Sequence, residues 1–240
     1  MEKEIILIYI NYSIMTIPKK FHYVFIGDIH EKIKEVMDFM IENNPDFEFK
    51  IWREKEVENY IKSKSELWYK YYKRINPKII ASKVDFFRYI LMYYEGGIYM
   101  DVKCKFTKPI EECFDLNLDY ILIKRVWSGR PYEFINGILI SKVNNPMFLK
   151  VIEEALKRID NYEYYHKKYR MRGRVWYITG PQLYTNTIEN NEKILEKLNV
   201  YINTNSREIN WIFAAVKNYK TLYKEKHYMK QSNEVRLILN

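Results

Sequence analysis

The residues with the clearest chemical potential lie in the segment 81–105. Asp85 and Arg88 stand three positions apart within a helical pattern of apolar residues, so their side chains share one face of that helix. A charged pair on an otherwise apolar helix is costly to bury unless the two groups pair with each other or hold a ligand. These residues alone leave both interpretations open, an internal ion pair and a polar binding site.

A further acidic residue, Asp101, stands at the carboxyl end of a short strand expected over 98–101. Ligands of open α/β sheets bind beyond the carboxyl ends of the strands, so Asp101 is a candidate site residue. The preceding Gly96 and Gly97 permit a tight reversal from helix to strand and a close approach of the backbone to a neighbour or a ligand.

The elements that must position these residues are predicted from periodicity. An apolar and aromatic run over 21–26 predicts a buried strand, and the alternation over 47–52 predicts a second one. Between them, apolar residues at helical spacing predict a helix that ends at 43–46; they are Ile33, Val36, Met37, Met40 and Ile41. A strand, a helix and a strand in this spacing form a βαβ unit and hence a parallel sheet.

The rest of the chain continues the α/β pattern. A polar helical stretch over 54–75 precedes a helix that Asn76 can cap, Pro77 can start and Gly96 can end. Strands are expected at 98–101, near 120–124 and at 137–141, with a helix over 146–159 and a mostly helical part from 162 onward.

One domain over 16–240 is the expected organisation, because no internal repeat, low-complexity segment or linker interrupts the chain. Met15 stands just before the first motif, so residues 1–15 are expected to be an extension or a start-site artefact. The apolar run over 5–10 is far shorter than the ~20 residues of a membrane span, and no signal-peptide pattern follows it. We therefore expect no membrane span.

The amino-acid composition indicates which classes of binding partner to expect. Lys and Arg number 40 against 31 Asp and Glu, and the net charge of +9 favours anionic partners such as phosphorylated small molecules. The positive charge is spread along the chain without the pattern of a known nucleic-acid-binding motif, so we expect no nucleic-acid partner. Cys104 and Cys113 are too few for a disulfide framework and form no C-x-x-C motif, so we expect a reducing compartment. Because no membrane span or signal-peptide pattern is found, the expected location is the cytoplasm.

Two motifs in the chemically rich segment, Asp85-x-x-Arg88-Tyr89 and Gly96-Gly97-Ile98-Tyr99-x-Asp101, resemble the sugar-binding region of the DXD-containing glycosyltransferases. That group includes glycosyltransferase family 32, typified by the yeast initiating mannosyltransferase, and is related to the clostridial glucosylating toxins. Further segments resemble the family in the same order along the chain: the opening strand over 17–27, the Asn136-containing strand over 134–141, the Thr179-Gly180-Pro181 turn and His227.

The resemblance implies a GT-A type fold, that is, a Rossmann-like mixed sheet flanked by helices in a single domain with a helical C-terminal part. It also implies a retaining glycosyltransferase that moves a sugar from a nucleoside diphosphate, UDP or GDP, to a hydroxyl on a glycan, a lipid or a protein. The alternative is a catalytically weak or inactive relative that binds nucleotide sugars or glycans.

The resemblance also assigns roles to individual residues. Phe25 would stack on the nucleobase, and Asp85 and Arg88 would hydrogen-bond hydroxyls of the donor sugar. Tyr99 would approach the diphosphate or the sugar, and Gly97 would be a further substrate-binding residue. The other implied site residues are Asp101, which would contact the ribose, the sugar or a metal-bound water, Asn136 near the reacting carbon, and His227 as a further binding residue.

One position departs from the family pattern. The second Asp of the Asp-x-Asp motif, usually the direct ligand of Mn²⁺ or Mg²⁺, is replaced here by Lys103. An ammonium cannot ligate a cation, but it can pair with phosphate oxygens. Three interpretations follow, in order of preference. Lys103 replaces the metal and the enzyme is metal-independent; a metal still binds through Asp101, the diphosphate and a residue of the tail; or activity is lost and only sugar binding remains. Asp101 and Lys103 share a face only if the strand continues that far.

Overall fold

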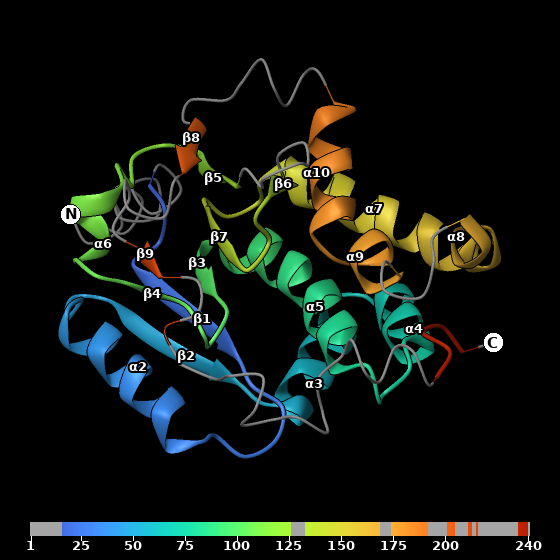
Figure 1. Ribbon diagram of the computed structural model, residues 1–240, viewed down its shortest axis with the longest axis horizontal. Coiled ribbons are helices and arrows are strands. Elements are labelled where there is room, and N and C mark those ends of the chain that lie inside the picture. Colours follow the sequence, from blue (N-terminus) through green and yellow to red (C-terminus); the bar gives the residue numbers. More distant parts are fainter. Residues whose placement is uncertain are drawn as a thin grey trace, which may run out of the picture.

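The computed structural model describes residues 16–125, 133–168, 174–191, 201–204, 211–212, 215 and 235–239. A mixed α/β fold is built around a seven-stranded sheet (Figure 1). Its strands are β1 (Lys20–Val24), β2 (Glu48–Trp52), β3 (Gly97–Met100), β5 (Tyr120–Arg125), β6 (Glu133–Phe134), β7 (Ile138–Ser141) and β8 (Tyr201–Thr204). They lie in the order β2-β1-β3-β7-β5-β6, and β8 also pairs with β5. β4 (Lys105–Phe106) and β9 (Trp211–Ile212) form a separate antiparallel pair.

The first half of the sheet is parallel and the second half is mixed. β1 pairs in parallel with both β2 and β3, and helix α2 (Glu31–Glu42) connects β1 to β2. This arrangement confirms the predicted βαβ unit. β7 is antiparallel to both of its neighbours, β3 and β5, which makes the whole sheet mixed as expected for the predicted fold class.

Helices cover both faces of the sheet because successive strand residues point to opposite sides. On one face, Ile98 and Met100 share a core with the buried side of α2. On the other face, Tyr99 shares a second core with α5 (Ile80–Glu95) and α7 (Pro146–Asp160). Figure 1 shows the same division, with α2 on one side of the sheet and α3, α5 and α7 on the other.

The remaining helices are α3 (Glu54–Lys64), α4 (Glu66–Arg74), α6 (Ile110–Cys113), α8 (Tyr162–Lys168), α9 (Arg174–Ile178) and α10 (Pro181–Glu189). The stretch expected to be helical over 54–75 is therefore two helices, because Ser65 adopts an extended backbone and caps α4 through Trp68 N. The expectation of a mostly helical part after 162 holds to Glu189, but β8 and β9 follow.

Helix α5 carries Asp85 and Arg88. The position of its C-terminal end was predicted correctly, but that of its N-terminal end was not. Its end at Gly96 is confirmed, with a positive φ of 61°. The predicted cap at Asn76 and the predicted start at Pro77 are both wrong, because the helix begins at Ile80. The side chain of Asn76 instead accepts a hydrogen bond from Lys78 N and donates one to Arg236 O, so it forms a turn and anchors the C-terminal segment.

Gly97 is required by the packing of β3 against β1. Its φ is +77°, and a Cβ added there would lie 2.6 Å from the carbonyl oxygen of Lys20. Gly27 offers a matched comparison, since its φ is +104° but nothing lies within 4 Å of an added Cβ.

We therefore expect Gly97→Ala to lower the free energy of unfolding by at least about 3 kcal/mol, because backbone strain and a clash with β1 add together. Gly27→Ala should cost about 1–2 kcal/mol, because only the backbone conformation is strained. Urea denaturation of both variants measures the difference. Equal losses would contradict a steric role for Gly97.

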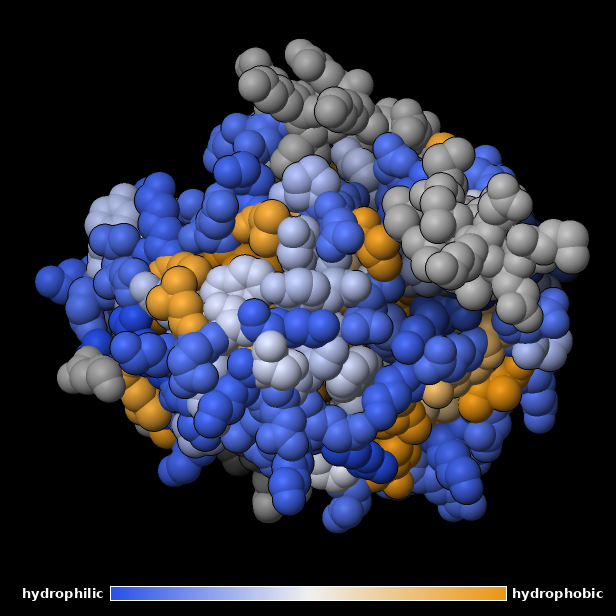
Figure 2. Space-filling view, turned by 180° about the vertical axis from the view of Figure 1, so that it is seen from behind, coloured by the Kyte–Doolittle hydropathy of each residue, from blue (hydrophilic) through white to orange (hydrophobic). Residues whose placement is uncertain are grey.

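The surface seen from behind is mainly hydrophilic, with separate small apolar patches (Figure 2). Within the described ranges, none of the helices combines the length and the apolar character that a membrane crossing requires. The proposed boundary at residue 16 stays a prediction, because residues 1–15 lie outside the described part of the chain.

Candidate active site

Three segments distant in sequence meet at the carboxyl end of β3. Asp85 and Arg88 come from the middle of α5, Asp101 directly follows β3, and Asn136 lies between β6 and β7. The loop after β3 is tied to the turn before β7, since Asp101 N donates a hydrogen bond of 2.8 Å to Gly137 O. This bond holds the candidate carboxylate beside the helix that carries its partners.

Arg88 is the centre of the site, buried with 5% of its surface exposed. Its Nη2 lies 3.1 Å from Asp85 Oδ1 and 3.3 Å from Asp101 Oδ1, and its Nη1 donates to the backbone oxygen of Asn136. The guanidinium also lies over the ring of Tyr99, 4.6 Å from its centroid. A planar guanidinium held by two carboxylates, a carbonyl and an aromatic face has a fixed orientation.

Asp85 lies in the most buried part of the site. Its Oδ1 accepts a hydrogen bond of 3.1 Å from Asn136 Nδ2, and its Oδ2 accepts one of 3.3 Å from Thr179 Oγ1. Burial raises the pKa of Asp85 to about 6, although Arg88 acts in the opposite direction. The carboxylate is therefore mainly ionised at neutral pH.

The raised pKa of Asp85 predicts a pH-dependent stability. The folded state holds the proton more tightly than the unfolded state, so the stability that Asp85 contributes is lost as pH rises from about 4 through about 6. The loss should approach about 3 kcal/mol. Comparing the free energy of unfolding of the wild type with that of Asp85→Asn across this range isolates the effect. A difference between the two that does not change with pH would contradict the raised pKa.

Asp101 and Lys103 form the more exposed edge of the site, with side chains 16% and 26% exposed. Asp101 Oδ1 accepts from Tyr99 OH at 2.9 Å, and Oδ2 accepts from Lys103 Nζ at 2.7 Å. Burial by itself would raise the pKa of Asp101, but the positive charges of Lys103 and Arg88 outweigh it and hold the pKa below its usual value.

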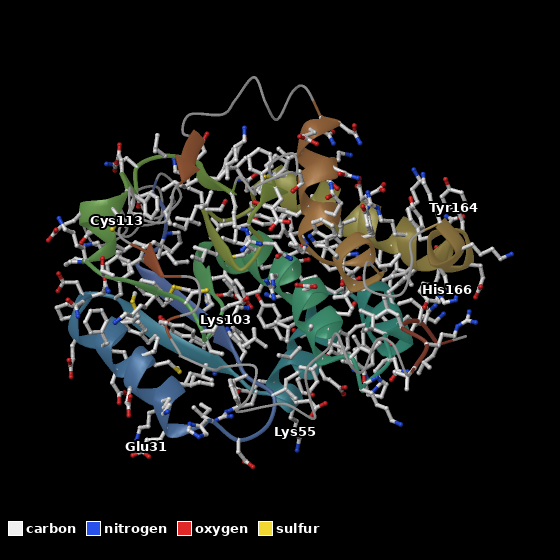
Figure 3. The ribbon with its side chains drawn as sticks, in the orientation of Figure 1. Glu31, Lys55, Lys103, Cys113, Tyr164 and His166 are labelled. Atoms are coloured by element: carbon white, nitrogen blue, oxygen red, sulfur yellow. The ribbon has the colours of Figure 1, made fainter. Side chains whose placement is uncertain are left out.

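The Lys103 ammonium reaches Asp101 across a turn. The strand ends at Met100, so strand alternation does not place the two side chains on one face. The turn brings Lys103 back toward Asp101 instead, and Figure 3 shows Lys103 near the middle of the molecule while the other labelled side chains lie toward its periphery. We call Asp85, Arg88, Asp101 and Lys103 the charged cluster.

The charged cluster does not offer the ligands of a divalent cation. In the described part of the chain, no group of three or more His, Cys, Asp and Glu side chains could hold a metal ion. Both oxygens of Asp101 already accept hydrogen bonds from Tyr99, Arg88 and Lys103, two of which are cations. The described residues therefore do not fit the Mn²⁺ or Mg²⁺ that an Asp-x-Asp motif would hold.

Phe25 and Gly97 lie at opposite ends of the neighbouring parallel strands β1 and β3. β1 and β3 are parallel with His22 opposite Tyr99, so Phe25 lies at the same carboxyl edge as Asp101. Its ring is buried and carries the guanidinium of Arg53 5.8 Å from the centroid. Gly97 begins β3 at the other edge, so the structure does not bring it into the site, and its role is to let β3 approach β1.

Tyr99 contacts two members of the charged cluster, Asp101 and Arg88. Its ring is 1% exposed, and its hydroxyl donates to Asp101 beneath the guanidinium of Arg88. The structure therefore places Tyr99 as a partner of two site residues, where the sequence predicted an approach to the diphosphate or sugar. His227, the other predicted binding residue, lies outside the described residues.

Sequence reasoning assigned no role to Tyr89, Thr179 or Ser82, which complete the buried network. Tyr89 OH donates to Thr179 O at 2.9 Å and accepts from Asn136 Nδ2 at 2.9 Å. The hydroxyls of Ser82 and Thr179 are 2.6 Å apart. Tyr89 and Thr179 stand inside the motifs that resemble the family, so their positions in those motifs could have identified them as site residues.

The C-terminal part of the chain returns to the edge of the site. β9 pairs with β4, which follows the charged cluster directly, and Ala215 N donates a hydrogen bond of 2.8 Å to Lys103 O. The backbone around Lys103 is therefore held by a segment more than a hundred residues away in the sequence.

The fold is that of the GT-A glycosyltransferase domains. The glycosyltransferase PaToxG has a similar structure, with a TM-score of 0.55 and 20% identity over 98% of this chain and 86% of that one. The UDP-bound glycosyltransferase domain of the YGT toxin gives a TM-score of 0.57 at 9% identity, with 94% of this chain and 92% of that one covered. The predicted fold class is confirmed.

The family resemblance predicted from the motifs is confirmed as well. Residues 30–127, which hold Asp85, Arg88 and Asp101, match the family described as "Glycosyltransferase sugar-binding region containing DXD motif". The initiation-specific alpha-1,6-mannosyltransferase of Candida albicans is 28% identical, over 54% of this chain and 40% of that protein. This chain thus spans less than half the length of that relative.

Proposed function

We propose that this protein is a retaining glycosyltransferase that uses a nucleoside-diphosphate sugar, UDP- or GDP-linked, as its donor. The observation that carries the proposal is the charged cluster, which pairs Asp85 and Arg88 on α5 with Asp101 after β3. It lies within the segment that matches the sugar-binding region. It also lies at the carboxyl ends of the strands, where α/β folds bind ligands.

The donor sugar would be held by the charged cluster. A carboxylate accepts hydrogen bonds from two sugar hydroxyls, and a guanidinium donates to others in a fixed plane. Arg88 and Asp85 are already oriented by Asn136 and Thr179, so little reorganisation is needed on binding. Phe25, at the same edge of the sheet, would contact the nucleobase.

The transfer step would break the bond between the anomeric carbon and the diphosphate oxygen, and both electrons would leave with the diphosphate. The acceptor hydroxyl would attack the same face of the sugar, and its proton would pass to the departing phosphate oxygen. Asp85 is buried and already bonded to Arg88, Asn136 and Thr179, which favours this front-face substitution over a covalent enzyme intermediate.

The acceptor would be a hydroxyl on a glycan, a lipid or a protein. The protein would act in the cytoplasm, because two cysteines, Cys104 and Cys113, do not make the disulfide framework of an oxidising compartment. A second candidate function is nucleotide-sugar binding without transfer, which Lys103 motivates because it stands where the family has a metal-binding Asp.

The test is to incubate the protein with UDP-glucose, UDP-N-acetylglucosamine and GDP-mannose, with and without a mixture of simple glycans and glycolipids. Donor binding is measured by calorimetry, release of UDP or GDP by nucleotide assay, and the anomeric configuration of the product by NMR. We expect nucleotide release from one donor class and a product of unchanged configuration. Binding without release would favour the second candidate, an inverted product would overturn retention, and neither binding nor release would overturn the proposal.

A further inference from the structure

The negative charge of Asp101 is already neutralised by neighbouring cations of the protein. Asp85 pairs with Arg88, and Asp101 pairs with Lys103 and Arg88 at 2.7 and 3.3 Å. The charged cluster therefore contains two carboxylates and two cations. A divalent cation bound here would sit against an ammonium and a guanidinium with no net negative charge to attract it.

An incoming diphosphate changes that balance. It brings at least two negative charges to the edge of the site, and further charge develops on it when the sugar leaves. The Lys103 side chain is 26% exposed and its ammonium lies beside Asp101, so a diphosphate bound at this side of the site would lie close to a positive charge. An ammonium carries three N–H donors, so Lys103 can hold Asp101 and contact a phosphate oxygen at the same time.

The position of the ammonium is held from two sides. Asp101 fixes Nζ, and the backbone oxygen of Lys103 accepts from Ala215 N at 2.8 Å. Asp101 is in turn held by Tyr99 and by its own backbone bond to Gly137 O. A cation held in place before the substrate arrives stabilises developing charge without a reorganisation cost.

We infer that Lys103 takes the place of the divalent cation and binds the diphosphate of the donor directly, so that this site works without a metal. The inference rests on the proposed function, because it assumes a nucleoside-diphosphate donor. It assigns Asp101 to positioning the Lys103 ammonium rather than to metal ligation.

Calorimetric titration with UDP and with GDP, in EDTA and in Mn²⁺, tests the inference. The affinity of the wild type for the bound nucleotide should be the same in both conditions. Lys103→Ala should weaken binding about 10- to 100-fold, the usual size of a lost charge-assisted hydrogen bond. Lys108→Ala is the matched control, since Lys108 is an exposed lysine near Glu112, and it should bind like the wild type.

Lys103→Asp gives the reverse test. It restores the Asp-x-Asp pattern, so binding should be weak in EDTA and recover with Mn²⁺. Wild-type binding that requires Mn²⁺, or unchanged binding by a folded Lys103→Ala, would overturn the inference and leave the proposed function standing. No binding of either nucleotide under any condition would overturn the proposed function itself. The two failures are therefore distinguishable, even if Lys103→Asp does not fold.

Discussion

Replacing Asp101 with Asn should lower the turnover of sugar transfer by about 10²- to 10³-fold, the usual cost of losing one preorganised electrostatic group. Asp101 is the residue that joins both cations of the site, Arg88 at 3.3 Å and Lys103 at 2.7 Å. An asparagine of the same shape keeps one oxygen but cannot hold a guanidinium and an ammonium by charge. Both cations then lose their orientation toward the donor. The expected loss is measured by steady-state kinetics of sugar transfer, with the donor that the protein accepts.

The control for this variant is Asp119→Asn. Asp119 also pairs with a lysine, Lys142, at 2.9 Å, but its side chain is 60% exposed and lies outside the charged cluster. Its loss should leave turnover unchanged and cost little stability. Thermal unfolding of both variants shows whether the fold is intact. Wild-type turnover by a folded Asp101→Asn would refute the role given to the charged cluster.

Replacing Arg88 with Met should lower the free energy of unfolding by about 3–5 kcal/mol, because a buried carboxylate then loses its partner. Asp85 is 6% exposed and accepts only neutral hydrogen bonds besides its contact with Arg88, from Asn136 and Thr179. Methionine fills a similar volume without charge. The loss therefore reports the unpaired charge more than a cavity, and urea denaturation at pH 7 measures it.

A second substitution separates the charge effect from packing. Asp85→Asn in the Arg88→Met background removes the stranded carboxylate, so the double variant should be more stable than Arg88→Met alone. Arg88 also pairs with Asp101, but Lys103 still balances that carboxylate. A double variant that loses the sum of the two single effects would show that Asp85 and Arg88 do not interact as the structure indicates.

Local patterns predicted the elements that carry the site. The spacing of Asp85 and Arg88 within α5, the end of that helix at Gly96 and the position of Asp101 after β3 all follow from short-range periodicity and glycine conformation. The prediction was weaker where polar side chains had a choice of partner. Asn76 was expected to cap α5, but it bonds Arg236 O, a residue 160 positions away that no local pattern reveals.

The sequence by itself determined the residue types of the site, the helix face that Asp85 and Arg88 share, and the departure at Lys103 from the family pattern. Only the tertiary structure decided that Asn136 and Thr179 bond Asp85, across 51 and 94 positions of the chain. It also decided that Lys103 closes back on Asp101 after the strand has ended. The physical reason is range: periodicity fixes directions within one element, whereas contacts between elements depend on how the whole sheet and its helices pack.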